Sequence, residues 1–175
     1  FMGSELFGKT LGLIGCGRIG SIVADRAIGL KIKVIAYDPF FQKSDVSEFN
    51  ISLVEQENLF SLSDVISIHL PLTNDTKDLI NENSFKLMKR NPIIINSSRG
   101  SIVNELDLIE AYSQNVISGF ALDVYSSEPV QEDFYKQISN SMNCILTPHN
   151  SGVTSESNVR VSQFIAEKTI DFLES

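Results

Sequence analysis

Three glycines near the start of the chain have the spacing of a phosphate-binding turn. Gly15, Gly17 and Gly20 stand directly after an apolar run and directly before a helical pattern. In that context the first glycine permits a tight turn and the second lets the backbone approach a pyrophosphate, while the third lets a helix pack closely on a strand. The amide groups at the helix N-terminus then face the phosphates. The motif therefore predicts dinucleotide binding.

An acidic residue follows the second apolar run at the distance that such a site requires. Asp38 lies about 20 residues beyond the glycines, where a dinucleotide fold places the carboxylate that accepts the ribose hydroxyls. A carboxylate at this position also repels a 2′-phosphate, so the sequence favours NAD over NADP. The alternative interpretation gives Asp38 only a turn role before Pro39.

Three charged or titratable residues follow three later apolar runs. They are Arg99, Glu128 and His149. An arginine can grip a carboxylate with two N–H donors, and a histidine exchanges a proton near neutral pH while a neighbouring carboxylate holds its tautomer. Each of the three, taken alone, also has a purely structural interpretation. Their common position after strands predicts that they lie on one edge of a sheet.

The apolar runs alternate with helical segments. The predicted strands are 10–14, 32–37, 65–70, 93–96, 117–122 and 144–147. Most are apolar throughout, which is typical of strands buried on both faces of a parallel sheet. A 3.6-residue spacing predicts helices at 18–30, 83–89, 104–112 and 155–173. We expect a single α/β domain over residues 1–175, a doubly wound parallel sheet of the Rossmann type with helices on both faces.

The composition argues against several other classes of protein. The 175 residues carry 14 Lys and Arg against 22 Asp and Glu, and a net charge of −8 repels a nucleic-acid backbone. No run approaches the length of a membrane span, and no secretory signal pattern is present, so we expect a cytoplasmic protein. The spacing of the two cysteines and two histidines supports neither a disulfide framework nor a metal site.

The ordered set of motifs resembles the NAD-binding domain of the D-isomer-specific 2-hydroxyacid dehydrogenases. The resemblance covers nearly the whole chain and includes His69-Leu70-Pro71-Leu72-Thr73, Asn96-Ser97-Ser98-Arg99-Gly100, Ala121-Leu122-Asp123-Val124-Tyr125 and Thr147-Pro148-His149. No single string decides the matter, but their order is highly specific. The chain departs from the family at Cys16, where a larger apolar residue is more common, and in the polar run 150–152.

The resemblance implies a role for each motif residue. His149 is implied as the acid/base that takes the proton from the substrate's 2-hydroxyl, with Glu128 as its carboxylate partner. Arg99 is implied to hold the substrate carboxylate, and Asp123 to bind the nicotinamide carboxamide. The positions that line NAD are implied to be Gly15, Gly17, Arg18, Ile19, Gly20, Asp38, Leu70, Pro71, Thr76, Ser97, Ser98, Arg99, Asp123, His149 and Gly152.

The resemblance also implies a reaction, the transfer of a hydride between NAD and a small D-2-hydroxy acid. D-3-phosphoglycerate is the best single candidate for this substrate. The alternatives are a glyoxylate or hydroxypyruvate reductase of the same family and a non-catalytic, NAD-responsive module of the corepressor kind. Family members carry a second domain that closes over the substrate, so we expect these 175 residues alone to bind NAD but to turn substrate over poorly. Homodimerisation through the cofactor domain is also implied.

Overall fold

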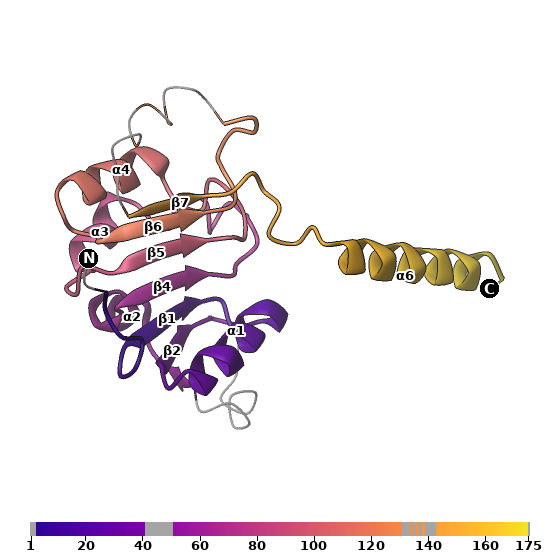
Figure 1. The fold of residues 1–175 in the computed structure, drawn as a ribbon, viewed down its shortest axis with the longest axis horizontal. Helices are drawn as coiled ribbons and strands as arrows, with labels where there is room; N and C mark the ends of the chain where they lie inside the picture. The colour runs from indigo at the N-terminus through magenta and orange to yellow at the C-terminus, as the bar shows by residue number, and fades with distance from the viewer. Residues whose placement is uncertain are drawn as a thin grey trace.

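A single parallel sheet organises the chain. The computed structural model describes residues 3–40, 51–130, 134, 136, 138 and 143–174. Its seven strands run in the order β3-β2-β1-β4-β5-β6-β7, all parallel (Figure 1). They are β1 (Thr10–Ile14), β2 (Lys33–Tyr37), β3 (Ser52–Leu53), β4 (Val65–Ile68), β5 (Ile93–Asn96), β6 (Gly119–Leu122) and β7 (Cys144–Leu146). The order reverses between β1 and β4, the switch point where doubly wound folds bind ligands.

The predicted α/β fold is confirmed, and the predicted elements recur with ends shifted by a few residues at most. The helices are α1 (Arg18–Gly29), α2 (Gln56–Leu62), α3 (Glu82–Leu87), α4 (Glu105–Ser113) and α6 (Ser155–Glu174). The sequence did not predict β3 and α2. With two and seven residues, these elements are too short for a hydrophobic period to stand out.

Side chains from alternate strand residues pack into two apolar cores on opposite faces of the sheet. In β2, Ile35 packs into the larger core beneath α2, α3 and α4, while Val34 and Ala36 pack into the smaller core beneath α1. Both cores contain fully buried side chains, such as Phe60 in the larger and Leu13 in the smaller. Because both faces are apolar, the strands show no polar alternation, as the sequence indicated.

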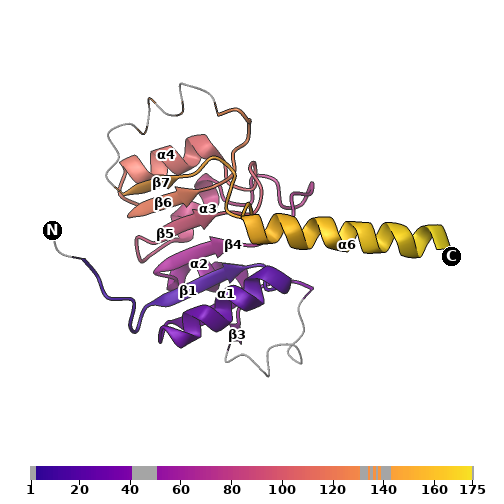
Figure 2. The ribbon, with the colours of Figure 1, turned by 45° about the vertical axis from the view of Figure 1, so that its right-hand side comes forward.

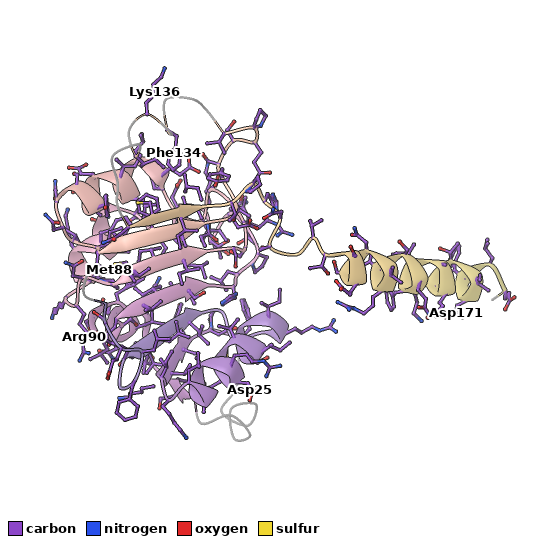
Figure 3. All side chains as sticks on the ribbon, viewed as in Figure 1. Asp25, Met88, Arg90, Phe134, Lys136 and Asp171 are labelled. Carbon is purple, nitrogen blue, oxygen red and sulfur yellow. The ribbon has the colours of Figure 1, made fainter. Side chains whose placement is uncertain are left out.

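The described helices leave half of one sheet face uncovered. On the α1 side they cover β1 and β2 but not β5 to β7, so Ile93 is 41% exposed and Ile145 is 66% exposed. A hollow of about 830 Å³ lies over this region, and Ser4 is among the residues that line it. Arg90 belongs to its rim at the amino ends of the strands (Figure 3). This hollow is therefore separate from the carboxyl edge where the predicted site residues lie.

Helix α6 projects away from the sheet beyond the carboxyl ends of the strands (Figures 1 and 2). It contains no buried residue, and its apolar side chains, including Val159 and Phe172, are largely exposed. Polar residues such as Asp171 share the same helix (Figure 3). Among the described residues, neither α6 nor any other helix is long and apolar enough to cross a membrane.

Candidate cofactor and catalytic site

The glycine turn between β1 and α1 has the close approaches that its sequence predicts. Gly15 has a φ of 91°, and a Cβ there would lie 2.7 Å from the carbonyl oxygen of His69. A Cβ on Gly20 would lie 2.3 Å from the carbonyl oxygen of Gly15. Gly17 faces open space and begins α1 without a side-chain cap. The first N–H groups of α1 are therefore available to an anion.

Asp38 lies beside this turn at the end of β2. One of its carboxylate oxygens accepts the Cys16 N–H at 2.8 Å, and the other accepts the Phe40 N–H at 2.9 Å. Burial, together with the charge of Asp38, raises the pKa of the Cys16 thiol to about 11. Cys16 thus stays protonated and packs as a small buried side chain.

The segment after β4 forms a compact turn at the same edge. The Thr76 hydroxyl donates to the Pro71 carbonyl at 2.7 Å and lies 3.1 Å from the Thr73 hydroxyl, which fixes the backbone after Leu70. The His69 ring contacts the Ser67 hydroxyl through Nε2 at 3.0 Å, and burial lowers its pKa. The His69 ring is therefore a hydrogen-bonded, structural part of the sheet edge.

Asn96, at the end of β5, organises the turn that carries Arg99. Its side-chain oxygen accepts the Ser98 N–H and hydroxyl at 3.1 and 3.0 Å, and its amide donates to the Arg99 carbonyl at 2.9 Å. A Cβ on Gly100 would lie 1.8 Å from the Tyr125 carbonyl oxygen, so only glycine fits there. The Arg99 side chain is exposed, and one N–H donates to the Ser98 carbonyl at 2.6 Å.

His149 and Glu128 form a contact across two loops. The His149 Nδ1 lies 2.9 Å from the Glu128 Oε2, and both side chains are roughly half exposed. The hydrogen bond from His149 is the main cause that lowers the pKa of Glu128. His149 has a φ of 52°, in the left-handed region that non-glycine residues seldom adopt. The pairing that sequence spacing could not establish is therefore present.

Asp123 holds the loop on which His149 lies. It is 5% exposed and accepts hydrogen bonds from the Thr147 hydroxyl and from the N–H groups of Asn150 and Ser151, the latter two at 3.0 Å. Burial acts to raise the pKa of Asp123, but the hydrogen bonds from Ser151, Thr147 and Asn150 outweigh it and lower that pKa to about 2. The carboxylate therefore stays charged.

The structure places the predicted site residues at the carboxyl edge of the sheet. The glycine turn and Asp38 follow β1 and β2, and the later residues follow β4, β5, β6 and β7. Arg18 and Ile19 are exposed on the first turn of α1, and Ser97 is exposed after β5. Gly152 lies further along, where its carbonyl accepts the Ser157 hydroxyl at 2.8 Å.

Sequence reasoning assigned no role to three residues that organise this edge: Asn96, Tyr125 and Thr147. Asn96 carries a readable signal, since a polar residue closing an apolar strand often caps the following turn. The other two bond to partners more than 20 residues away in sequence, so no local pattern reveals them.

Residues 1–151 match the family described as D-isomer specific 2-hydroxyacid dehydrogenase, NAD binding domain. The chain belongs to this family. It is 40% identical over 171 residues to the D-3-phosphoglycerate dehydrogenase of Archaeoglobus fulgidus. The aligned region covers 98% of this chain and 32% of that protein. It is 39% identical to the hydroxypyruvate reductase of Thermotoga maritima, over 95% of this chain and 53% of that protein. The glyoxylate reductase of Korarchaeum cryptofilum is 35% identical to this chain, over 98% of this chain and 51% of that protein.

Solved structures of family members have the same fold. The NAD-complexed D-isomer specific 2-hydroxyacid dehydrogenase of Lactobacillus delbrueckii ssp. bulgaricus superposes with a TM-score of 0.90 at 28% identity, over 99% of this chain and 56% of that one. The chain thus spans a third to about a half of the length of these relatives. It is an NAD-binding domain, and its glycine turn, open helix N-terminus and Asp38 fit that cofactor.

Proposed function

We propose that this chain is the NAD-binding part of a dehydrogenase that transfers a hydride between NAD and a small D-2-hydroxy acid, with D-3-phosphoglycerate as the best candidate. The observation that carries the proposal is the 2.9 Å contact between His149 and Glu128, on the same sheet edge as Arg99 and the glycine turn.

The paired side chains have complementary tasks in this reaction. With Nδ1 donating its proton to Glu128, Nε2 of His149 is an acceptor that can take the proton of the substrate's 2-hydroxyl. The negative charge of Glu128 then stabilises the imidazolium that forms. NAD, when bound, supplies the acceptor for the hydride that leaves the same carbon.

Arg99 is assigned to the substrate carboxylate. A guanidinium has five N–H donors, and the contact with the Ser98 carbonyl occupies one of them. The remaining donors can form a two-pronged contact with a carboxylate and polarise the adjacent carbonyl oxygen of the 2-oxo acid. The Asn96 bonds hold the turn so that this side chain starts from a fixed backbone.

Cofactor selectivity tests the proposed role of Asp38. Thermal unfolding should shift upward with NADH and much less with NADPH, since a ligand at 100 times its Kd stabilises the folded state by about 2.7 kcal/mol. Asp38→Asn should narrow the difference between the two cofactors because it removes the charge that repels a 2′-phosphate. Asp25→Asn, on the exposed side of α1 (Figure 3), is the matched control and should keep the wild-type preference. Equal shifts by both cofactors in the unmodified chain contradict the assignment.

Catalysis is tested in a chimera in which this chain replaces its counterpart in the Archaeoglobus relative. We expect NADH formation from D-3-phosphoglycerate, and a loss of roughly 100-fold or more in kcat for His149→Gln. Asn150→Gln, at the next residue, is the control for general disturbance of the loop. A chimera that binds NADH but makes none from this substrate, while the parent enzyme is active, argues against the catalytic assignment.

The substrate assignment has a parallel test. The equivalent chimera with the Thermotoga relative is assayed with hydroxypyruvate, and the activity of each chimera is divided by that of its parent. We expect the larger fraction in the phosphoglycerate chimera. A larger fraction in the other chimera favours the hydroxypyruvate reductase alternative.

We also propose that the chain forms the homodimer that the family resemblance implies. Exposed apolar residues on α4 and α6, such as Leu106 and Val159, offer surfaces for it. Sedimentation of the chain at micromolar concentration decides between a dimer and a monomer.

A further inference from the structure

Tyr125 lies where the loops that carry Glu128 and His149 meet. It follows the end of β6, and its side chain is 6% exposed. Its ring meets the ring of Phe134 edge-on, with centroids 6.1 Å apart; Phe134 is labelled in Figure 3. Packing therefore holds the ring in place, and its hydroxyl has a defined position.

The Tyr125 hydroxyl joins the ends of β6 and β7. Its oxygen lies 2.9 Å from the Thr147 carbonyl oxygen and 3.2 Å from the Leu122 carbonyl oxygen. A hydroxyl has one proton, and the shorter contact favours donation to Thr147. Pro148, with its restricted φ, is the only residue between Thr147 and His149. Fixing the Thr147 carbonyl therefore restricts where the backbone of His149 can lie.

The backbone of Tyr125 holds the other member of the pair. Its N–H donates to Oε1 of Glu128 at 3.3 Å, while Oε2 of the same carboxylate contacts His149. One residue thus contacts Glu128 directly and the segment before His149 through its hydroxyl. The two contacts therefore connect the carboxylate of Glu128 to the segment that carries His149.

The backbone of His149 needs such support. Its φ of 52° is unfavourable for a residue with a side chain and persists only where neighbouring contacts determine it. Asp123 holds the chain after His149 through the N–H groups of Asn150 and Ser151. The Tyr125 hydroxyl adds a bond to the backbone on the other side, at Thr147.

We propose that Tyr125 is a positioning residue that fixes the geometry of the His149–Glu128 pair through its hydroxyl. The inference deepens the proposed function, because it assigns a task in orienting the pair that handles the proton. Tyr125→Phe removes only the hydroxyl and keeps the ring packing and the backbone N–H. Tyr112→Phe is the matched control, since Tyr112 also packs edge-on against a phenylalanine, Phe120, but lies in α4.

The test follows the pair itself by NMR, independent of activity. In the chain labelled with ¹³C at glutamate, the Glu128 signal is assigned with Glu128→Gln and titrated with pH. The bond from His149 lowers the Glu128 pKa, so Tyr125→Phe should raise that pKa towards its ordinary value. Tyr112→Phe should leave it unchanged. With only two histidines in the chain, the ¹⁵N signals of the His149 ring report its tautomer in the same samples.

Kinetics in the Archaeoglobus chimera give the second readout. Tyr125→Phe should lower kcat roughly tenfold with an unchanged KM for NAD, because misplacing a proton-transfer group slows chemistry and leaves cofactor binding intact. Wild-type Glu128 and His149 signals in a folded Tyr125→Phe variant would overturn the inference. If the chimera with the unsubstituted chain is inactive, that result contradicts the proposed function but not the role of Tyr125. The NMR comparison still decides the role of Tyr125.

Discussion

Replacing Asp123 by asparagine should destabilise the chain in a pH-dependent way. The carboxylate is buried and has a pKa of about 2, against an ordinary value of 3.8. Each unit of difference corresponds to about 1.4 kcal/mol, so the charged form contributes about 2 kcal/mol to the free energy of unfolding at pH 7. Asp123→Asn should lose that contribution. The NH₂ group of the new asparagine would also face the N–H groups of Asn150 and Ser151, so that one donor faces another.

The sign of the pH dependence follows from the direction of the shift. Because folding favours the deprotonated form, the contribution is present above about pH 4 and is lost as the pH falls from 3.8 towards 2. Denaturant unfolding at pH 7, 5, 4 and 3 should therefore show a wild-type advantage whose pH-dependent part falls to about half at pH 3, while the cost of the mismatched amide stays constant. Asp171→Asn, on exposed α6, is the control and should stay within about 0.5 kcal/mol of wild type. A difference that does not change down to pH 3 refutes the reasoning.

Two further predictions concern the glycine turn and the catalytic pair. Gly20→Ala should destabilise the chain and abolish stabilisation by NADH in thermal unfolding, because its Cβ meets the Gly15 carbonyl; Gly29→Ala, in the same helix with open space around it, should be neutral or stabilising by up to about 1 kcal/mol. His149→Asn should raise the Glu128 pKa towards its ordinary value, since the His149 bond lowers it. An unchanged ¹³C titration of Glu128 in that variant contradicts the observed contact.

Local patterns in the sequence were sufficient for the sheet and for the edge that carries the site. Buried parallel strands lack polar alternation, so the runs at 10–14 and 93–96 were predicted with the ends that the structure shows. Parallel strands bring all their carboxyl ends to one edge, which places Arg99 with His149. The glycine spacing predicted the turn because this fold needs residues without a Cβ at the same three positions, for the tight turn, the phosphate contact and the helix packing.

Contacts between distant segments were beyond such reasoning. The bond from Tyr125 to Thr147 spans 22 residues, and nothing in either local string indicates it. The open half of the sheet face was equally hidden, since Ile93 and Ile145 have the same apolar character as covered strand residues. Whether an apolar strand face is covered depends on where a helix elsewhere in the protein packs, and the periodicity of the strand does not record it.

Asp123 uses its whole carboxylate to hold the loop that carries His149. A carboxylate offers about four lone-pair sites, and four donors reach this one: the Thr147 hydroxyl, the Asn150 N–H, and the N–H and hydroxyl of Ser151. Together these donors keep the buried group charged, because they outweigh the effect of burial on its pKa. Since all four donors lie within two residues of His149 in sequence, loss of Asp123 should displace the loop that places the proposed acid/base.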